Sequence, residues 1–221
     1  MIALDAMSNA YSTTLTCPHC HQAFDATVDR TIDAETDSDL LRLILEGTYG
    51  QTTCPHCLTK LYADTPLTVT DREHGTTLEF TATTDPIVVQ RTAEHLMATI
   101  AERSANQQYR LVMHFDDLRE KLIMLKSGLD DRVVEVMKFA AAKKRREIKP
   151  NETFDRVMFY RRSGEGFLVF LEDLSRTVAE VPFKRTTYQA VKARMTLTGS
   201  PLLVNGAWVM QYLEKHPWPM D

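Results

Sequence analysis

Long apolar runs are missing from this chain of 221 residues. The longest contain about four residues, as in 167–170, whereas about 20 are needed to cross a bilayer. The first residues also lack the basic and then apolar pattern of a secretion signal. We therefore expect no membrane segment and a cytoplasmic protein.

Glycine and proline are scarce, with 8 and 9 copies and no tract of either. This scarcity excludes collagen-like, low-complexity and mucin-like chains. Because 43% of the side chains are hydrophobic, the chain can bury one sizeable core or two smaller ones. The composition is that of an ordinary folded protein.

An excess of positive charge is missing as well, since the formal net charge is −4. Residues 1–85 carry 13 acidic and 4 basic side chains, residues 86–149 carry 9 and 13, and residues 150–221 carry 8 and 9. Polyanion binding needs a positive face to neutralise phosphates. A general nucleic-acid binder is therefore not expected, and any such contact would be local.

Familiar catalytic motifs are missing too. The chain has no G-x-G-x-x-G, no G-x-x-x-x-G-K-[ST], no H-E-x-x-H and no G-x-S-x-G. His114, Asp116 and Asp117 form an acid/base or metal candidate, but aspartates at a helix start commonly cap the helix, and we favour that role. We predict a non-enzymatic protein, with an enzyme of unrecognised site as an alternative.

What the chain does contain is one tetrapeptide in two copies, Cys-Pro-His-Cys. The copies hold all four cysteines, Cys17, Cys20, Cys54 and Cys57. Two chelating pairs supply the four thiolates of a closed, tetrahedral structural zinc site. The 33 intervening residues exceed the roughly 15–20 of a minimal ribbon, so a substructure must lie between the pairs. We predict one structural Zn²⁺ bound by these four cysteines in a zinc-ribbon-like unit.

Three other chemistries compete with zinc. Cys-Pro-His-Cys also occurs in thiol oxidoreductases, but there a long helix follows the motif, whereas the alternating residues after Cys57 predict a strand. Residues 17–21 match a haem-attachment motif, which requires export and which the second copy lacks because Leu58 replaces the axial histidine. Disulfides are disfavoured in a reducing compartment.

Three histidines adjoin the thiolates. His19 and His56 lie in the turns between ligands and are expected to face solvent, because four cysteines already complete the site. His21 is expected at most to contact the cysteine ligands, without binding the metal ion itself. None of the three is predicted as a ligand, although a contribution from His21 stays open.

The predicted fold class is α+β with three parts. Residues 1–85 form the zinc-ribbon-like unit with an inserted short helix, residues 86–149 form a helical segment with an αα-hairpin, and residues 150–221 form an antiparallel β-meander with helices. Ser38 or Asp39 is expected to cap the inserted helix, which ends at Gly47. Asp85 is expected to cap a helix that extends to about Ser104.

The remaining expected elements follow from hydrophobic periodicity and turn residues. They are a hairpin of 67–70 and 77–81 around Gly75, a strand at 109–113, helices at 115–127 and 131–149, strands at 154–160, 167–170 and 178–183, and helices at 186–197 and 206–215.

A run of four cations, Lys143 to Arg146, ends one predicted helix. Such residues complement the negative end of the helix dipole and tolerate water, so we interpret the run as a solvated helix end. Nucleic-acid binding is an alternative that we do not favour, and a protein partner is predicted instead. Tyr160, Phe167 and Trp208 are candidates for that contact, although we favour core positions for them.

Three stretches together resemble one family. They are the twin Cys-Pro-His-Cys motifs, residues 31–47 and residues 122–138, and they resemble the bacterial CpXC proteins, named after their Cys-Pro-x-Cys pairs, over about residues 14–140. The resemblance implies a metal-binding domain with no established activity. Family members often have glycine directly after each pair. This chain has His21 and Leu58 there, so we expect no positive φ at these positions and slightly altered geometry.

Overall fold

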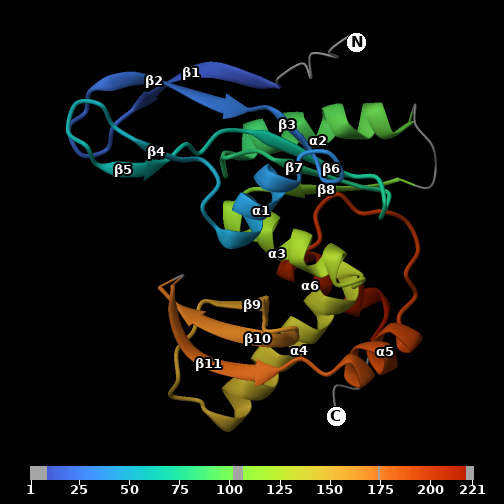
Figure 1. Ribbon diagram of the computed structural model, residues 1–221. Helices are drawn as coiled ribbons and strands as arrows, with labels where there is room; N and C mark the ends of the chain where they lie inside the picture. Colours follow the sequence, from blue (N-terminus) through green and yellow to red (C-terminus); the bar gives the residue numbers. More distant parts are fainter. Residues whose placement is uncertain (1–8, 102–106, 174, 218–221) are drawn as a thin grey trace. The chain divides into compact units, whose positions relative to one another are not determined.

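The structure is a computed structural model that describes residues 9–101, 107–173 and 175–217. The structure combines helices with mainly antiparallel sheets, which confirms the α+β class (Figure 1). The chain forms two compact units, residues 1–119 and 120–221. Independent folding of residues 1–85 stays a prediction. No helix in the described ranges is long and apolar enough to cross a membrane.

The elements of the first unit are listed here in chain order. They are β1 (Ala10–Thr16), β2 (Ala23–Asp29), β3 (Thr31–Asp33), α1 (Ser38–Glu46), β4 (Gln51–Thr53), β5 (Lys60–Tyr62), β6 (Leu67–Asp71), β7 (Thr76–Phe80), α2 (Pro86–Ala101), β8 (Gln108–Val112) and the start of α3 (Phe115–Lys126).

The first unit contains two hairpins and one four-stranded sheet. The hairpins are β1–β2 and β4–β5, and the sheet has the order β3-β6-β7-β8. Its centre is the antiparallel β6–β7 hairpin, and Gly75 turns with φ of 57°, as predicted. Both outer strands pair in parallel, β3 with β6 and β8 with β7. The sheet therefore extends past residue 85.

Two helices cover opposite faces of this sheet (Figure 1). On α1, Leu41 and Ile44 are buried, and Gly47 ends the helix at φ of 76°. The predicted caps of α1 are wrong: the N-cap is Asp37, whose carboxylate accepts a bond from the Asp33 amide instead of capping the helix. The Asp85 carboxylate does cap α2 and accepts the Ile87 amide at 2.8 Å. The expected end near Ser104 lies outside the described residues.

The second unit contains the rest of α3, α4 (Asp131–Ile148), β9 (Arg156–Arg162), β10 (Glu165–Glu172), β11 (Arg176–Pro182), α5 (Arg185–Arg194) and α6 (Gly206–Lys215). Gly128 separates α3 from α4, and the Asp130 carboxylate caps α4. Packing of these two helices as an αα-hairpin stays a prediction. The three strands form the predicted antiparallel meander, in the order β11-β10-β9.

A cluster of apolar side chains forms the core of this unit. Its buried members are Met124, Leu129, Val133, Val134, Met137, Phe154, Val157, Phe159, Leu168, Phe170 and Tyr188. Gly166 lies so close to Phe159 that an added Cβ would be 2.9 Å from the ring, which explains glycine at this site. The interpretation of Tyr160, Phe167 and Trp208 as core residues is wrong, because none of them is buried.

Candidate metal centre

The two Cys-Pro-His-Cys motifs fold into the same backbone structure. Each lies in the turn of a hairpin, the first between β1 and β2 and the second between β4 and β5. In each motif the carbonyl oxygen of the first cysteine accepts a hydrogen bond from the backbone amide four residues later. The amide of the same cysteine donates a hydrogen bond to the carbonyl oxygen five residues later. The four distances are 2.9 Å (His21 to Cys17), 3.0 Å (Cys17 to Gln22), 2.9 Å (Leu58 to Cys54) and 2.9 Å (Cys54 to Thr59).

The residue after each motif has a left-handed backbone conformation. The φ of His21 is 59° and the φ of Leu58 is 60°. The expectation that these replacements of glycine remove the positive φ is therefore wrong. A left-handed conformation costs a side-chain-bearing residue about 1–2 kcal/mol. The closed turn keeps the conformation although 77% of Leu58 is exposed and little burial offsets the cost.

The two turns bring the four sulfur atoms together. The Cys17 and Cys57 Sγ atoms are 3.6 Å apart, and those of Cys20 and Cys54 are 3.7 Å apart. All four lie within 4.8 Å of one another, and none is in a disulfide. A tetrahedral zinc with Zn–S bonds of about 2.3 Å separates its sulfurs by about 3.8 Å. The spacing therefore suits one tetrahedral metal ion.

Burial and hydrogen bonding divide the four thiols. Cys17 and Cys54 are fully buried, and Cys20 and Cys57 are half-buried. Hydrogen bonding by the Thr59 side chain and backbone lowers the pKa of Cys57 to about 5. A backbone hydrogen bond at Gln22 acts to lower the pKa of Cys20, but burial and the neighbouring thiols outweigh it and raise that pKa to about 12. Four thiolates this close need a cation to offset their charge.

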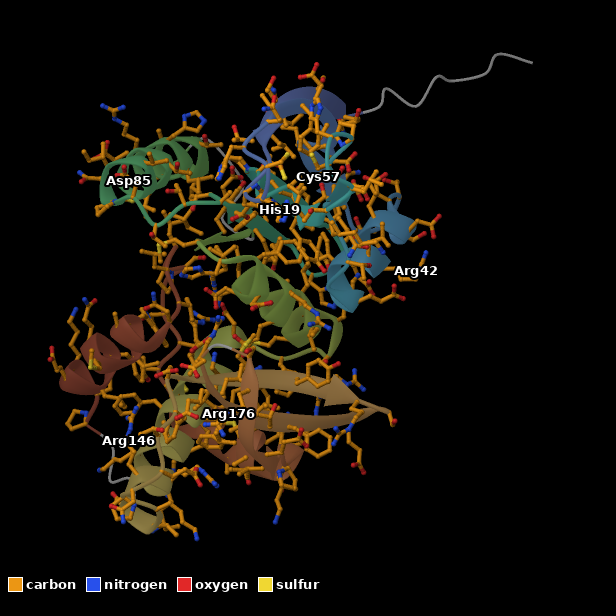
Figure 2. All side chains as sticks on the ribbon, turned by 90° about the vertical axis from the view of Figure 1, so that its left-hand side faces the viewer. His19, Arg42, Cys57, Asp85, Arg146 and Arg176 are labelled. Atoms are coloured by element: carbon orange, nitrogen blue, oxygen red, sulfur yellow. The ribbon has the colours of Figure 1, made fainter. Side chains whose placement is uncertain are left out.

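The neighbouring histidines lie outside this cluster. His19 and His56 are exposed, as predicted, and His56 Nε2 is 3.2 Å from the Ala23 carbonyl oxygen. His19 adds a hydrogen bond that lowers the pKa of Cys57. Figure 2 labels His19 and Cys57 in this part of the first unit. The group of metal-type ligand atoms consists of the four sulfurs.

The segment after Cys57 distinguishes this centre from a thiol oxidoreductase. The predicted strand is present as β5, and no helix starts at either motif. A redox thiol of the thioredoxin type draws its reactivity from a helix N-terminus. That source of thiolate stabilisation is absent from both motifs.

A second group of metal-type ligands was missed by the sequence analysis. Asp71, Glu73 and His74 lie in and beside the β6–β7 turn. Asp71 is buried, and its Oδ1 is 2.8 Å from His74 Nδ1 and accepts the His74 amide at 2.9 Å. The sequence signals only a turn here, and these bonds close it. At the other candidate, Asp116 and Asp117 lie in the first turn of α3, directly after His114.

Buried ion pairs in the second unit were also missed. Lys138 Nζ on α4 lies 2.9 Å from the Glu120 carboxylate and 3.0 Å from that of Glu135. Burial raises the pKa of Glu135. Burial alone would lower the pKa of Lys138, but the two carboxylates outweigh it and raise that pKa. Lys138 thus offsets part of the charge of two buried carboxylates. Sequence analysis missed these residues because charged side chains are normally exposed.

Comparison with known proteins gives one match. No curated protein matches the chain, and no solved structure matches it. The family model described as "CpXC protein" matches residues 15–138, which is more than half of the 221 residues and includes all four cysteines. The chain therefore belongs to the CpXC family.

Proposed function

We propose that Cys17, Cys20, Cys54 and Cys57 bind one Zn²⁺ ion and that the ion is structural. The convergence of the four sulfurs from two hairpins carries this proposal, with cross-pair distances of 3.6 and 3.7 Å. Four thiolates complete the tetrahedron and leave no position for a water molecule or a substrate. A centre of this kind supports a fold and does not supply catalysis.

The surroundings of the cysteines support a zinc-ribbon-like unit. We call residues 10–29 and 51–62 the ribbon; it consists of the two hairpins that carry the motifs. Its small buried cluster contains Phe24 and Ala26 besides Cys17 and Cys54, and the half-buried Leu15 and Leu61 pack against it. So little apolar surface stabilises two hairpins poorly, and a bound metal ion supplies what the core lacks.

We further propose that the protein acts by binding another protein. The ribbon exposes two large apolar side chains, Leu58 at 77% and Tyr62 at 54%. An enzyme is less well supported because the proposed metal site is closed. Nucleic-acid binding is also less well supported, since the ribbon has no basic, aromatic-rich face.

The four-cation run makes local contacts instead. Arg145 forms a bidentate ion pair with the Glu152 carboxylate, in which the distance from Nη2 to Oε2 is 2.7 Å. Arg146 lies over the Phe154 ring at 4.8 Å, and Lys144 pairs with Glu147 at 3.8 Å. Figure 2 labels Arg146 on α4. Three of the four cations thus have contacts within the unit.

Cobalt substitution tests the proposed site. Co²⁺ added to reduced, metal-free protein should saturate at one equivalent and give the absorption of tetrahedral cobalt with sulfur-to-cobalt charge transfer. Added azide or imidazole should leave the spectrum unchanged, because no ligand position is open. A spectrum that shifts with azide would indicate an open, catalytic-type site, and octahedral absorption would contradict the site itself. Replacement of His21 by alanine is the matched control and should preserve the spectrum.

A further inference from the structure

The second unit contains a cavity of about 620 Å³ that has no part in the metal centre. It lies among α4, α5, the middle of β10 and the end of β11. The residues that line it are Val136, Met137, Ala140, Ala141, Lys143, Lys144, Glu147, Leu168, Val181, Pro182, Phe183, Lys184, Thr187, Ala190, Val191 and Arg194. Its volume falls within the roughly 300–1,000 Å³ of small-molecule sites.

The interior of the cavity is apolar because it extends the core of the unit. Val136, Met137 and Leu168 are buried, and the last two belong to the core cluster. The space is open because α4 and α5 contribute small side chains there, including Ala141 and Ala190. An apolar ligand in contact with these residues would be partly removed from water, which favours its binding.

The rim of the cavity is positively charged. Lys143, Lys144 and Lys184 line it together with one carboxylate, Glu147. That carboxylate already lies 3.8 Å from Lys144. The lining therefore has a net positive charge, and it favours an anionic group on whatever enters.

The start of α5 adds to this preference. The N-cap of α5 is Lys184, whose side chain makes no capping hydrogen bond, and the first turn contains no acidic residue. Lys184 and Thr187 both line the cavity, so the N-terminal turn borders it. The first amides of a helix lack partners within the helix and carry partial positive charge. An anionic group finds donors and a favourable dipole here.

The lining of the cavity follows long stretches of both helices. On α5 its lining extends from Lys184 to Arg194, and on α4 from Val136 to Glu147. At 1.5 Å per residue, each of these helix faces is about 15 Å long. A chain-like ligand suits this shape better than a compact ring.

We propose that the second unit binds a small amphipathic anion, an unbranched alkyl chain with one carboxylate head group. The chain lies along the apolar floor between α4 and α5. The head group contacts the lysines of the rim and the first turn of α5. This site assigns a role to Lys143 and Lys144, and it does not depend on the proposed metal centre.

Isothermal titration of the full chain with decanoate, below its micelle-forming concentration, tests the site. We expect saturable binding of one decanoate per chain. Acetate has the head group without the chain, and decyltrimethylammonium has the chain with the opposite charge. Both should bind at least tenfold more weakly. Equal binding of decyltrimethylammonium would overturn the proposal, since the charged rim would then not discriminate between an anionic and a cationic head group.

Two variants locate the binding. The double variant Lys143→Glu, Lys184→Glu changes only exposed side chains and should weaken decanoate binding at least tenfold. Lys215→Glu, on α6 and outside the lining, is the charge-matched control and should bind like the wild type. Ala190→Trp should fill the cavity and abolish binding while circular dichroism stays unchanged.

Wild-type affinity in the double variant would overturn the proposal, whether or not Ala190→Trp folds. Binding of an acidic helical peptide at this cavity in place of decanoate would overturn it as well, and would identify a protein-docking groove.

Discussion

The ribbon and the second unit are stabilised in different ways. The buried cluster of the ribbon has four members, two of which are cysteines, whereas the core of the second unit contains eleven residues and no cysteine. The second unit also buries charged groups, with Lys138 placed between two carboxylates. By our proposal, metal coordination by sulfur replaces apolar burial in a hairpin pair that is too small to bury much. The two regions should therefore respond to different perturbations.

The largest effect is expected from loss of a sulfur ligand. Structural zinc contributes about 10–16 kcal/mol of apparent binding free energy in small domains, so Cys54→Ser should unfold the ribbon. Amide hydrogen exchange should show lost protection in β1, β2, β4 and β5 and retained protection in β9 to β11. Thr53→Ser, at the exposed neighbouring position, is the control and should change neither region. Simultaneous unfolding of both regions would show that they are not independent.

The next largest effect is expected in the second unit, from the substitution Lys138→Met. Removing one member of a buried ion pair typically costs about 3–5 kcal/mol, because Glu120 and Glu135 would remain buried without a cation. Denaturant unfolding should show this loss in the second unit, and metal binding by the ribbon should be unchanged. The exposed Lys144→Met is the control and should cost far less. An equal effect of the two variants would contradict a role for burial.

The same variant should depend on pH in a defined direction. Burial raises the pKa of Glu135 in the folded state, and loss of the Lys138 charge should raise it further. The folded state then binds more protons than the unfolded state, so its stability falls as pH rises. Lys138→Met should therefore lose less stability relative to wild type at pH 5 than at pH 7. A deficit that is constant over this range would contradict the assignment.

A smaller effect is expected at the turn that closes the second motif. Leu58→Gly removes a left-handed strain of about 1–2 kcal/mol and adds up to about 1 kcal/mol of backbone entropy in the unfolded state. We expect the metal-loaded ribbon to gain about 0.5–1 kcal/mol in denaturant unfolding. Leu58→Ala keeps the strain and should show no gain. Equal effects of glycine and alanine would show that the gain comes from the lost side chain.

The smallest effect concerns the cations of α4. Replacing Lys143 and Lys144 by Gln should cost about 0.3–1 kcal/mol each at most, and less at high salt, since they act mainly on the helix dipole. Arg145→Gln should cost more, because it also breaks the pair with Glu152. Arg145 lowers the pKa of Glu152, so the contribution of this pair should be lost as pH falls through the range where Glu152 takes up its proton.

The same residues test the nucleic-acid alternative. Wild-type protein should not be retained on immobilised duplex or single strands near 0.15 M salt. Retention that is abolished by replacing all four cations with Gln would contradict a protein-binding role and favour phosphate contacts.

Local signals in the sequence predicted much of the fold. Gly47 ends α1 and Gly75 turns the β6–β7 hairpin as expected, and the Asp85 carboxylate caps α2. Long-range pairing was not predictable in this way. The parallel pairs β3–β6 and β7–β8 join strands far apart in the chain, and three-residue β3 carries too little pattern to identify its partner.

The candidate site shows the same division. Repetition of Cys-Pro-His-Cys indicated which residues converge, because two residues between cysteines allow one turn to aim both sulfurs at one point. The positive φ of Leu58 was not predictable from residue preference, since closure of the turn overrides the preference of an isolated leucine. The cavity in the second unit was missed because Ala141 and Ala190 are brought together only by packing of α4 against α5.

Metal content is the most direct test of the central claim that four sulfurs bind one structural ion. Protein purified under reducing conditions without added metal should contain one zinc per chain by elemental analysis. A variant with serine at Cys17, Cys20, Cys54 and Cys57 should contain none, and His21→Ala should contain one. Freshly prepared, reduced wild-type protein without stoichiometric metal, or a four-serine variant that still carries zinc, would contradict the account.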